Sequence, residues 1–204
     1  MSDLRFGDRP LAFTDLETTG LEKLRPVYPM PGREDLMRWH EFCEIGLVVA
    51  DQKTLEIKTE WSAKVRVEYP KRASPEALAV NGFTPEEWQN ALPVNEALKK
   101  YNELTAGAIF VSQVTVFDWT FLEIAYTMWG LEPTSVRHRI DMPSFAYATL
   151  LNKGYGVLPS YSLRKVAEFL GIPDEPMPHV GIEGARQLHR VFKALHELES
   201  QGMI

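Results

Sequence analysis

Two acidic residues, Asp15 and Glu17, lie two positions apart in an otherwise apolar segment near the start of the chain. In an extended strand, side chains two positions apart point to the same face, so both carboxylates would lie together while Leu16 points away. Carboxylates this close repel each other and raise one another's pKa unless a cation lies between them. A bare pair of acids is more often an incidental strand end, but the apolar flanks favour a site for Mg²⁺ or Mn²⁺.

The elements that must position these acids begin with a strand over 10–17, which is apolar and ends at Thr18-Thr19-Gly20. The uninterrupted apolar run at 42–50 predicts a second strand. Residues 55–67 predict a third strand, because their apolar side chains alternate with polar ones. These three strands are expected to be antiparallel neighbours.

Helices and one further strand are predicted in the rest of the chain. Ser74 and Thr84, each followed by proline, have the features of helix N-caps. Apolar residues at helical spacing predict further helices, and the run at 108–111 predicts a buried strand. The predicted helices are at 75–80, 84–88, 94–104, from 118 to about 128, 163–170 and from about 183. A mixed sheet with helices packed on it, an α/β architecture, follows from this order.

The composition is that of an ordinary globular protein, with 45% hydrophobic and 25% charged residues among 204. This length predicts one domain spanning 1–204. The net charge of −6 counts against a protein that coats long nucleic acid through a broad basic face. The one cysteine, Cys43, excludes a disulfide or a cysteine zinc site within a monomer. No segment has the features of a signal peptide or membrane span, so we expect a cytoplasmic protein without a membrane partner.

Four segments, in this order, resemble the DEDDh family of 3′→5′ exonucleases, which includes ribonuclease T, oligoribonuclease and the proofreading subunits of DNA polymerases. Residues 13–21, FTDLETTGL, resemble the first exonuclease motif. Residues 73–84, ASPEALAVNGFT, are similar to the middle helix-turn segment, and 117–122, FDWTFL, to the second motif. Residues 161–173, YSLRKVAEFLGIP, followed by His179, are similar to the approach to the third motif.

The resemblance implies a ribonuclease-H-like fold, an α/β fold with a mixed sheet flanked by helices, and two divalent metal ions, Mg²⁺ or Mn²⁺. It implies that Asp15, Glu17 and Asp118 are metal ligands, and that Glu17 and His179 take part in catalysis, with His179 as the general base. In such chemistry one ion makes hydroxide available and the other stabilises the leaving 3′ oxygen. Histidine suits general-base work because its ordinary pKa lies close to cellular pH.

The third motif departs from the family pattern. The family commonly has H-x-A-x-x-D, whereas residues 179–184 are HVGIEG, so the place of the acid is taken by Gly184. Glu183 comes one residue early, which on a helix turns its direction by roughly 100°. Its longer side chain and the adaptable first turn of a helix favour it as the fourth ligand. The alternative is an exposed glutamate at a helix N-terminus in a weakened site. Val114 also replaces an asparagine that many relatives have four residues before the second-motif acid, Asp118.

Substrate contacts are expected beside these acids. Leu21 and Phe117 are candidates to wedge or stack against unpaired bases, as apolar side chains do in single-strand binding. The turn residues Thr18 and Gly20 belong to the same segment. The Pro- and charge-rich residues from about 22 to 40 predict a loop insertion, longer than the usual link between the first two strands of the family.

The sequence thus predicts hydrolysis of phosphodiester bonds at the 3′ ends of single-stranded DNA or RNA. One alternative is a catalytically impaired relative that binds nucleic acid or protein. Gly184 and Val114, which depart from the family pattern, favour this alternative. Another is an endonuclease on the same fold, which His179 and the turn after Glu17 disfavour. A homodimer, and a polymerase partner in trans, are further expectations drawn from relatives.

Overall fold

The structure is a computed structural model that describes residues 6–20 and 40–200. Its strands are β1 (Leu11–Thr18), β2 (Phe42–Ala50), β3 (Ile57–Lys64), β4 (Ile109–Ser112) and β5 (Arg139–Asp141). Its α-helices are α1 (Pro75–Val80), α2 (Val94–Leu104), α3 (Thr115–Met128), α4 (Met142–Asn152), α5 (Leu163–Phe169) and α6 (Gly181–Ser200). Two short 3₁₀ helices, η1 (Phe6–Asp8) and η3 (Pro70–Arg72), complete the description.

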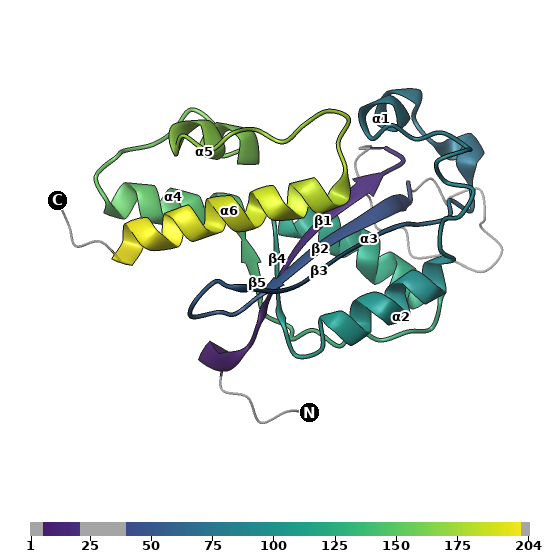
Figure 1. Ribbon diagram of the computed structural model, residues 1–204, viewed down its shortest axis with the longest axis horizontal. Helices are drawn as coiled ribbons and strands as arrows, with labels where there is room; N and C mark the ends of the chain where they lie inside the picture. Colours follow the sequence, from purple (N-terminus) through teal and green to yellow (C-terminus); the bar gives the residue numbers. More distant parts are fainter. Residues whose placement is uncertain (1–5, 21–39, 201–204) are drawn as a thin grey trace.

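The five strands form one mixed sheet in the order β3-β2-β1-β4-β5 (Figure 1). Strand β2 runs antiparallel to both β1 and β3, as the sequence predicted. Strand β4 runs parallel to β1, and β5 runs parallel to β4. The predicted α/β architecture is therefore confirmed, and β1 lies at the centre of the sheet with its carboxyl end at one edge of the fold.

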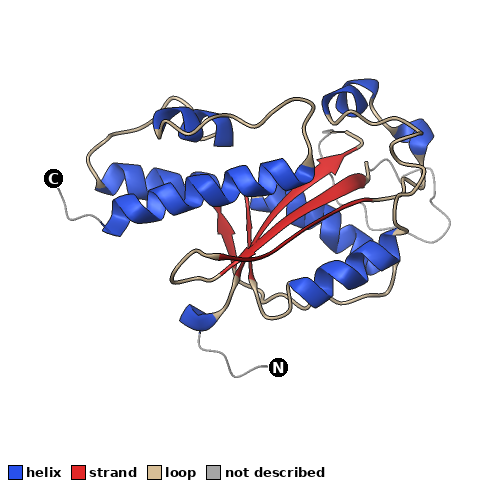
Figure 2. Ribbon diagram, viewed as in Figure 1, coloured by secondary structure: helices blue, strands red, loops and turns tan. Residues whose placement is uncertain are grey.

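Two helical layers cover the two faces of the sheet (Figure 2). One core joins Leu11 and Phe13 of β1 to helices α4, α5 and α6. The other joins Ala12 and Leu16 of β1 to helices α2 and α3. Side chains alternate between faces along a strand, so the odd-numbered positions of β1 point to the α6 side. Asp15 and Glu17 continue the odd-numbered series, which sends both carboxylates toward the start of α6.

The start of α6 lies directly on β2 because each element has a glycine at the point where they cross. A β-carbon at Gly46 would overlap the carbonyl group of Gly181, and one at Gly181 would lie 2.8 Å from the backbone nitrogen of Gly46. Gly46 also pairs with Asp15 across β1 and β2. The absence of side chains at this crossing thus allows the first turn of α6 to approach the acidic end of β1.

We expect Gly46→Ala to destabilise the protein by about 3 kcal/mol or more, because the added methyl group meets backbone that cannot rotate away. The overlap would force α6 away from β2. Urea unfolding of this variant and of the parent measures the loss. Gly7→Ala is the matched control, since a β-carbon at Gly7 has no atom within 4 Å. If Gly46→Ala were as stable as Gly7→Ala, the close helix–strand crossing would be wrong.

The segment predicted as a helix from Thr84 is a series of turns. The Thr84 hydroxyl accepts a hydrogen bond from the Glu87 amide at 3.1 Å, as an N-cap would. The chain must then extend, because the Leu92 amide donates to the Lys64 carbonyl at 2.9 Å beside the end of β3. This extended pairing prevents the turn from growing into a helix. The third strand is likewise shorter than the predicted 55–67, and ends at Lys64.

Other boundaries differ by a few residues, and one strand, one α-helix and both 3₁₀ helices were not predicted. Helix α3 begins at Thr115 rather than Asp118, and α6 begins at Gly181 rather than Glu183. Strand β5 has three residues, too few to show an alternating pattern. Helix α4 follows Asp141, whose side chain accepts a hydrogen bond from the Ser144 amide as an N-cap. The predicted insertion at 22–40 falls outside the described residues except for residue 40.

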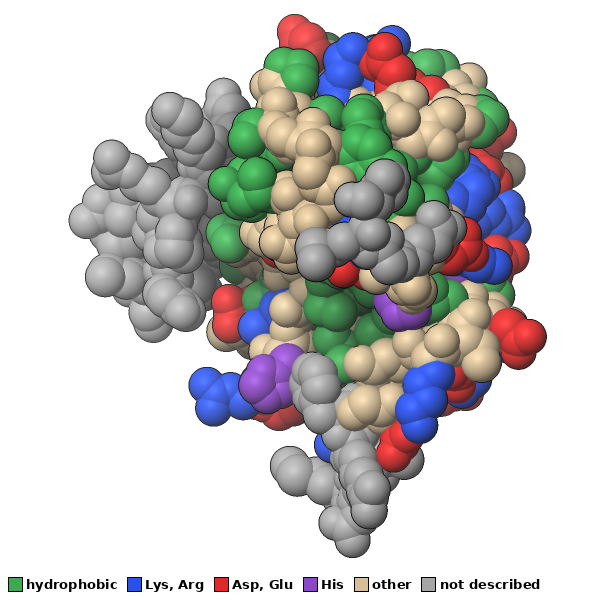
Figure 3. Space-filling view, turned by 90° about the vertical axis from the view of Figure 1, so that its left-hand side faces the viewer, with side chains coloured by type: hydrophobic (Ala, Val, Ile, Leu, Met, Phe, Trp, Pro, Cys, Tyr) green, Lys and Arg blue, Asp and Glu red, His purple; other side chains and the backbone are tan. Residues whose placement is uncertain are grey.

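The surface carries charges of both signs. On the face shown in Figure 3, lysine and arginine side chains are interspersed with aspartate and glutamate. Among the helices that the structure describes, none combines the length and the apolar character needed to cross a membrane.

Candidate active site

Three of the predicted metal ligands meet at the carboxyl end of β1. Asp15 and Glu17 lie near the carboxyl end of β1, and Asp118 lies in the first turn of α3. Helix α3 follows directly after β4, which is parallel to β1, so its first turn comes to the same end of the sheet. Asp118 is only 5% exposed, although it is an acid. The chain therefore brings acids that are about 100 positions apart in the sequence to one place.

The three carboxylates repel one another in a poorly hydrated site. Burial raises the pKa of Asp15 well above its usual range, and the charges of Asp118 and Glu17 raise that pKa further. Burial also raises the pKa of Glu17 to about 7, again with help from neighbouring carboxylates. The pKa of Asp118 is raised to about 7 by burial, against the opposing effect of the Ser112 hydroxyl. Such pKa values are typical of functional sites, because folding alone gains nothing from placing buried acids together.

Glu44 is a fourth acid near this cluster that the sequence analysis did not single out. It lies directly opposite Glu17 in the antiparallel pairing of β1 with β2, and it is 3% exposed. Its charge is the leading electrostatic contribution to the raised pKa of Glu17. The Glu44 Oε1 atom accepts a hydrogen bond from the Gly181 amide at 3.1 Å, which fixes the start of α6. Only the register of the two strands could have revealed this acid.

His179 lies in the loop between α5 and α6, as the third motif requires. Its amide donates to the carbonyl of Val80 at 3.0 Å, which fastens the loop to the end of α1. Its side chain is 36% exposed, so the imidazole is accessible to water. The Nδ1 atom of the ring lies 3.0 Å from Oε1 of Glu175, a second acid that the sequence analysis did not single out.

Gly184 occupies the place of the missing fourth acid, and it lies against Asp15. A β-carbon at Gly184 would lie within 2.6 Å of the Asp15 Cγ atom. Glu183 is engaged elsewhere, since its Oε1 atom accepts from Nη1 of Arg186 at 2.6 Å. Arg186 is held in turn by both carboxylate oxygens of Glu60 on β3, at 2.9 and 2.7 Å. The structure thus brings Asp15, Glu17 and Asp118 together, whereas the Glu183 side chain pairs with Arg186, and the role of Glu183 as fourth ligand stays a prediction.

The turn after β1 is held by the segment around α1. The Thr19 carbonyl accepts from the Ser74 amide at 2.7 Å, and the Thr18 carbonyl accepts from the Asn81 side chain at 3.1 Å. Ser74 and Asn81 are the caps at the two ends of α1. The segment at 73–84 therefore stabilises the position of the turn, and with it the carboxyl end of β1.

A cavity of about 470 Å³ opens beside Glu17. Phe117 and Thr18, two of the predicted substrate contacts, line it together with Leu16, Ala77 and Val80 and the polar Ser74 and Glu76. Gly20 is not among the residues that line the cavity, and it lies against the ring of His40, which a β-carbon at this position would overlap. Leu21 lies outside the described residues. An apolar pocket that borders on an acid suits a base or sugar whose phosphate lies at the carboxylates.

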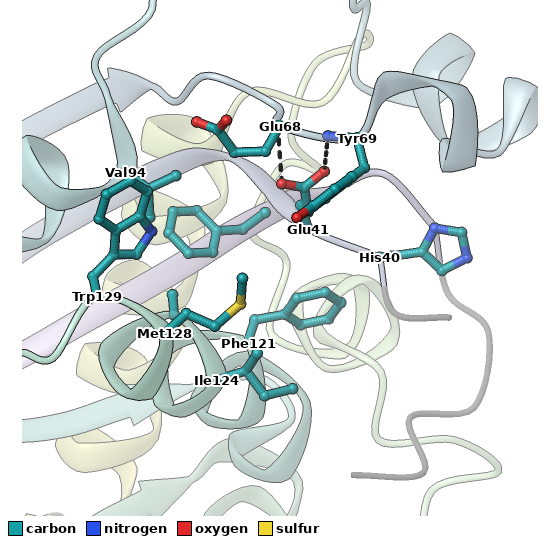
Figure 4. Close-up of a pocket in the computed structure, with 11 residues that line it drawn as sticks. His40, Glu41, Glu68, Tyr69, Val94, Phe121, Ile124, Met128 and Trp129 are labelled. Carbon is teal, nitrogen blue, oxygen red and sulfur yellow. Dashed lines mark hydrogen bonds between the residues drawn. The ribbon is translucent and has the colours of Figure 1, made fainter. Parts of the chain in front are cut away.

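A second cavity, of about 260 Å³, lies along α3 (Figure 4). Phe121, Met128 and Trp129 form its apolar wall. Glu41 lines it too, but that carboxylate already accepts hydrogen bonds from two backbone amides, at 3.0 and 2.8 Å. None of the three clustered acids is among the described residues that line this cavity. The cavity beside Glu17 is therefore the candidate substrate pocket.

Comparison with known protein families identifies the family of this chain. A family model described as exonuclease, of the ribonuclease T type, matches residues 12–192. The chain belongs to this exonuclease family. The predicted membership of the DEDDh class, and the prediction that the protein is a nuclease enzyme, are confirmed. A search among curated protein sequences gives no match.

Solved structures of exonucleases share the fold. The nuclease domain of 3'hExo, a DEDDh family member bound to rAMP, is 20% identical with a TM-score of 0.71, over 95% of this chain and 93% of that one. Exonuclease I of E. coli, in complex with a dT13 oligonucleotide, is 15% identical with a TM-score of 0.74. It matches 94% of this chain, which spans only 42% of the exonuclease I chain. The predicted ribonuclease-H-like fold is confirmed.

Exonucleases of this family use divalent metal ions, and the donors at the end of β1 fit such ions in their chemistry. All are carboxylate oxygens, which Mg²⁺ and Mn²⁺ prefer. Burial raises the pKa of both Glu17 and Asp118 to about 7, and a cation between such carboxylates would favour their ionised forms. In the part of the chain that the structure describes, no three such side chains already surround one ion position.

Proposed function

We propose that this protein removes nucleotides from the 3′ ends of single-stranded nucleic acid with two divalent ions, Mg²⁺ or Mn²⁺. The observation that carries the proposal is the convergence of Asp15, Glu17 and Asp118 beside an apolar cavity, within a chain of the exonuclease family. His179 lies on the loop that enters α6 above the same end of the sheet. This arrangement supports an end-specific nuclease better than a surface that coats long strands.

The roles of the side chains follow from their chemistry. When bound, divalent ions supply positive charge and Lewis acidity at the scissile phosphate. Asp15, Glu17 and Asp118 would hold that charge in place, because their mutual repulsion makes a cation the favoured occupant. His179 accepts a proton from the attacking water as a general base. The ring presents Nε2 for this purpose, since Nδ1 is occupied by Glu175 at 3.0 Å.

The substrate is proposed to be the terminal nucleotide of DNA or RNA. The similar structures are of an exonuclease domain with rAMP and of exonuclease I with a dT13 oligonucleotide, so the fold accommodates both sugars in those proteins. The cavity beside Glu17 is the proposed site of the terminal base. The homodimer and the polymerase partner stay predictions, as does the extent of the domain over 1–204.

The test is degradation of 5′-labelled single-stranded DNA and RNA with Mg²⁺, with Mn²⁺ and with chelator. A metal-dependent ladder that shortens from the 3′ end is expected. Circular single-stranded DNA should remain intact, because it has no end, and a 3′-terminal phosphorothioate should slow the first step. Cleavage of the circle would indicate an endonuclease. No cleavage of any strand, by folded and nuclease-free protein, would favour an impaired binding module.

We expect Phe117→Ala to raise KM for a short oligonucleotide about tenfold, because stacking of one base on an aromatic side chain contributes roughly 1–3 kcal/mol. The value of kcat should change little, since Phe117 lines the cavity but is not an acid of the cluster. Steady-state kinetics separates the two constants. Val116→Ala on the same helix is the control, since Val116 is 79% exposed and does not line the cavity. An equal KM for the two variants would exclude Phe117 from the substrate pocket.

A further inference from the structure

Helix α3 carries Asp118 in its first turn, but its own N-cap residue does not cap it. That residue is Val114, whose apolar side chain makes no cap hydrogen bond. The first backbone amides of a helix have no partners within the helix, so an N-cap that accepts from them stabilises the first turn. The preceding residue, Gln113, is directed to another segment, since its Nε2 atom donates to the Tyr161 carbonyl at 2.9 Å.

The cap of α3 comes instead from Asp141, the last residue of β5. Its Oδ2 atom accepts a hydrogen bond from the amide of Thr115, the first residue of α3, at 3.3 Å. The Thr115 hydroxyl donates to the Ile140 carbonyl at 3.2 Å, so the same strand holds both the amide and the hydroxyl of this residue. Asp141 reaches the start of α3 because it pairs with Ser112, the last residue of β4.

The same carboxylate caps a second helix. Its Oδ1 atom accepts from the Ser144 amide at 3.1 Å and from the Ser144 hydroxyl at 2.6 Å, both in the first turn of α4. One oxygen of Asp141 therefore serves α4 and the other serves α3. A negative charge is favourable at both places, because the N-terminus of a helix carries partial positive charge. Asp141 thus joins the starts of two helices that pack on opposite faces of the sheet.

The first turn of α3 connects this cap to the acid cluster. The amides of Phe117 and Asp118 both donate to the Val114 carbonyl, at 2.8 and 3.2 Å. A displacement of Thr115 would therefore move the turn that holds Asp118. It would also move Phe117, which lines the cavity beside Glu17.

We propose that Asp141 is a positioning residue of the metal site, which holds the first turn of α3, and with it Asp118, from the neighbouring strand. This assignment rests on the proposed exonuclease function and adds a residue that acts through the helix rather than on the metal. The meeting of Asp118 with the acids of β1 then depends on β5 as well as on β4.

The test separates the cap of α3 from the cap of α4. Serine is itself a favoured N-cap, so Asp141→Ser keeps an acceptor for α4, but it has no second oxygen for α3. Calorimetric titration should show that this variant binds Mn²⁺ about tenfold more weakly than the parent, the lower end of the range for groups that orient metal ligands. Adding Val114→Asn should return the affinity close to the parental value, because asparagine at the N-cap holds the same turn. Val114 is 48% exposed, so the surface can accommodate this change.

Ser162→Ala is the matched control, because it removes the N-cap of α5, a helix that carries none of the three clustered acids. The Ser162 hydroxyl accepts from the Lys165 amide at 3.4 Å. Both Ser162→Ala and Asp141→Ser should lower the melting temperature, since each loses a cap. Only Asp141→Ser should lose affinity for Mn²⁺ and activity on a labelled oligonucleotide. Circular dichroism of each variant verifies folding.

The outcomes distinguish this assignment from the function on which it rests. If the parent neither binds Mn²⁺ nor cleaves, the proposed function fails and the assignment fails with it. If the parent does both, but Asp141→Ser binds Mn²⁺ as tightly as the parent, the function stands and the assignment is overturned. The assignment is also overturned if Val114→Asn does not restore the affinity of Asp141→Ser, because the effect of Asp141 would then not act through the start of α3.

Discussion

Replacing Asp15 by asparagine is expected to lower kcat/KM by about a thousandfold or more, the scale on which groups that organise charge around a transition state act. The same change should raise the melting temperature of the metal-free protein. Asp15 is held among carboxylates, and its pKa is raised well above its usual range by burial and by the charges of Asp118 and Glu17. Asparagine keeps the shape and removes the charge, so it relieves this repulsion while it eliminates a metal ligand.

The opposite signs of the two effects distinguish a functional site from a structural one. Asp51→Asn is the matched control, because Asp51 is a surface acid whose carboxylate contacts Lys58 at 2.7 Å and two backbone amides. That variant should keep full activity and gain no stability. Activity is measured with a labelled oligonucleotide and Mg²⁺, and melting is followed with chelator present. Parental activity in Asp15→Asn, or a lower metal-free melting temperature than the parent, would contradict the proposed role.

The sequence was sufficient to predict the parts of the site that depend on local order. The alternation of a strand placed Asp15 and Glu17 on one face, and the apolar residues at helical spacing after Asp118 predicted a helix that follows a buried strand. Their convergence depends on the parallel pairing of β1 with β4, of which the sequence analysis predicted only that the sheet is mixed. Most of the acids of the site could therefore be predicted from the strand alternation at Asp15 and Glu17 and from the family resemblance at Asp118.

The parts that could not be predicted depend on register and on loop path. Glu44 lies opposite Glu17 only because of the exact pairing of β1 with β2, which no pattern within β2 reveals. Glu175 reaches His179 through a loop without regular structure, between α5 and α6. Glu183 was favoured as the fourth ligand from its position in the sequence. Its direction is set by Arg186 and by Glu60, a residue more than 100 positions away that the local sequence could not indicate.

The stability of the metal-free protein is expected to fall as pH rises from about 5 to 7, on the order of 3 kcal/mol from Glu17 alone. The pKa of Glu17 is about 7 in the folded protein, against an ordinary value of 4.5. Between these values the unfolded chain has released its proton while the folded chain retains it. The folded state binds more protons there, so each increase in pH favours unfolding. Above pH 7 both states are ionised and this penalty is complete.

The comparison with Glu17→Gln isolates this effect from other titrating groups. Buried His189 acts in the opposite direction, because its lowered pKa makes the folded state resist protonation as pH falls through 6.5. Both proteins share His189, so the difference between their free energies of unfolding removes it. That difference, from urea unfolding with chelator, should increase in favour of Glu17→Gln from pH 5 to 7 and then become constant. Saturating Mn²⁺ should restore the parent at pH 7.5 and have less effect on the variant, because bound cations stabilise only a folded state that can hold them. If the difference did not depend on pH, the pKa of Glu17 would not be raised in the folded protein. The cluster would then have no excess negative charge for a cation to offset.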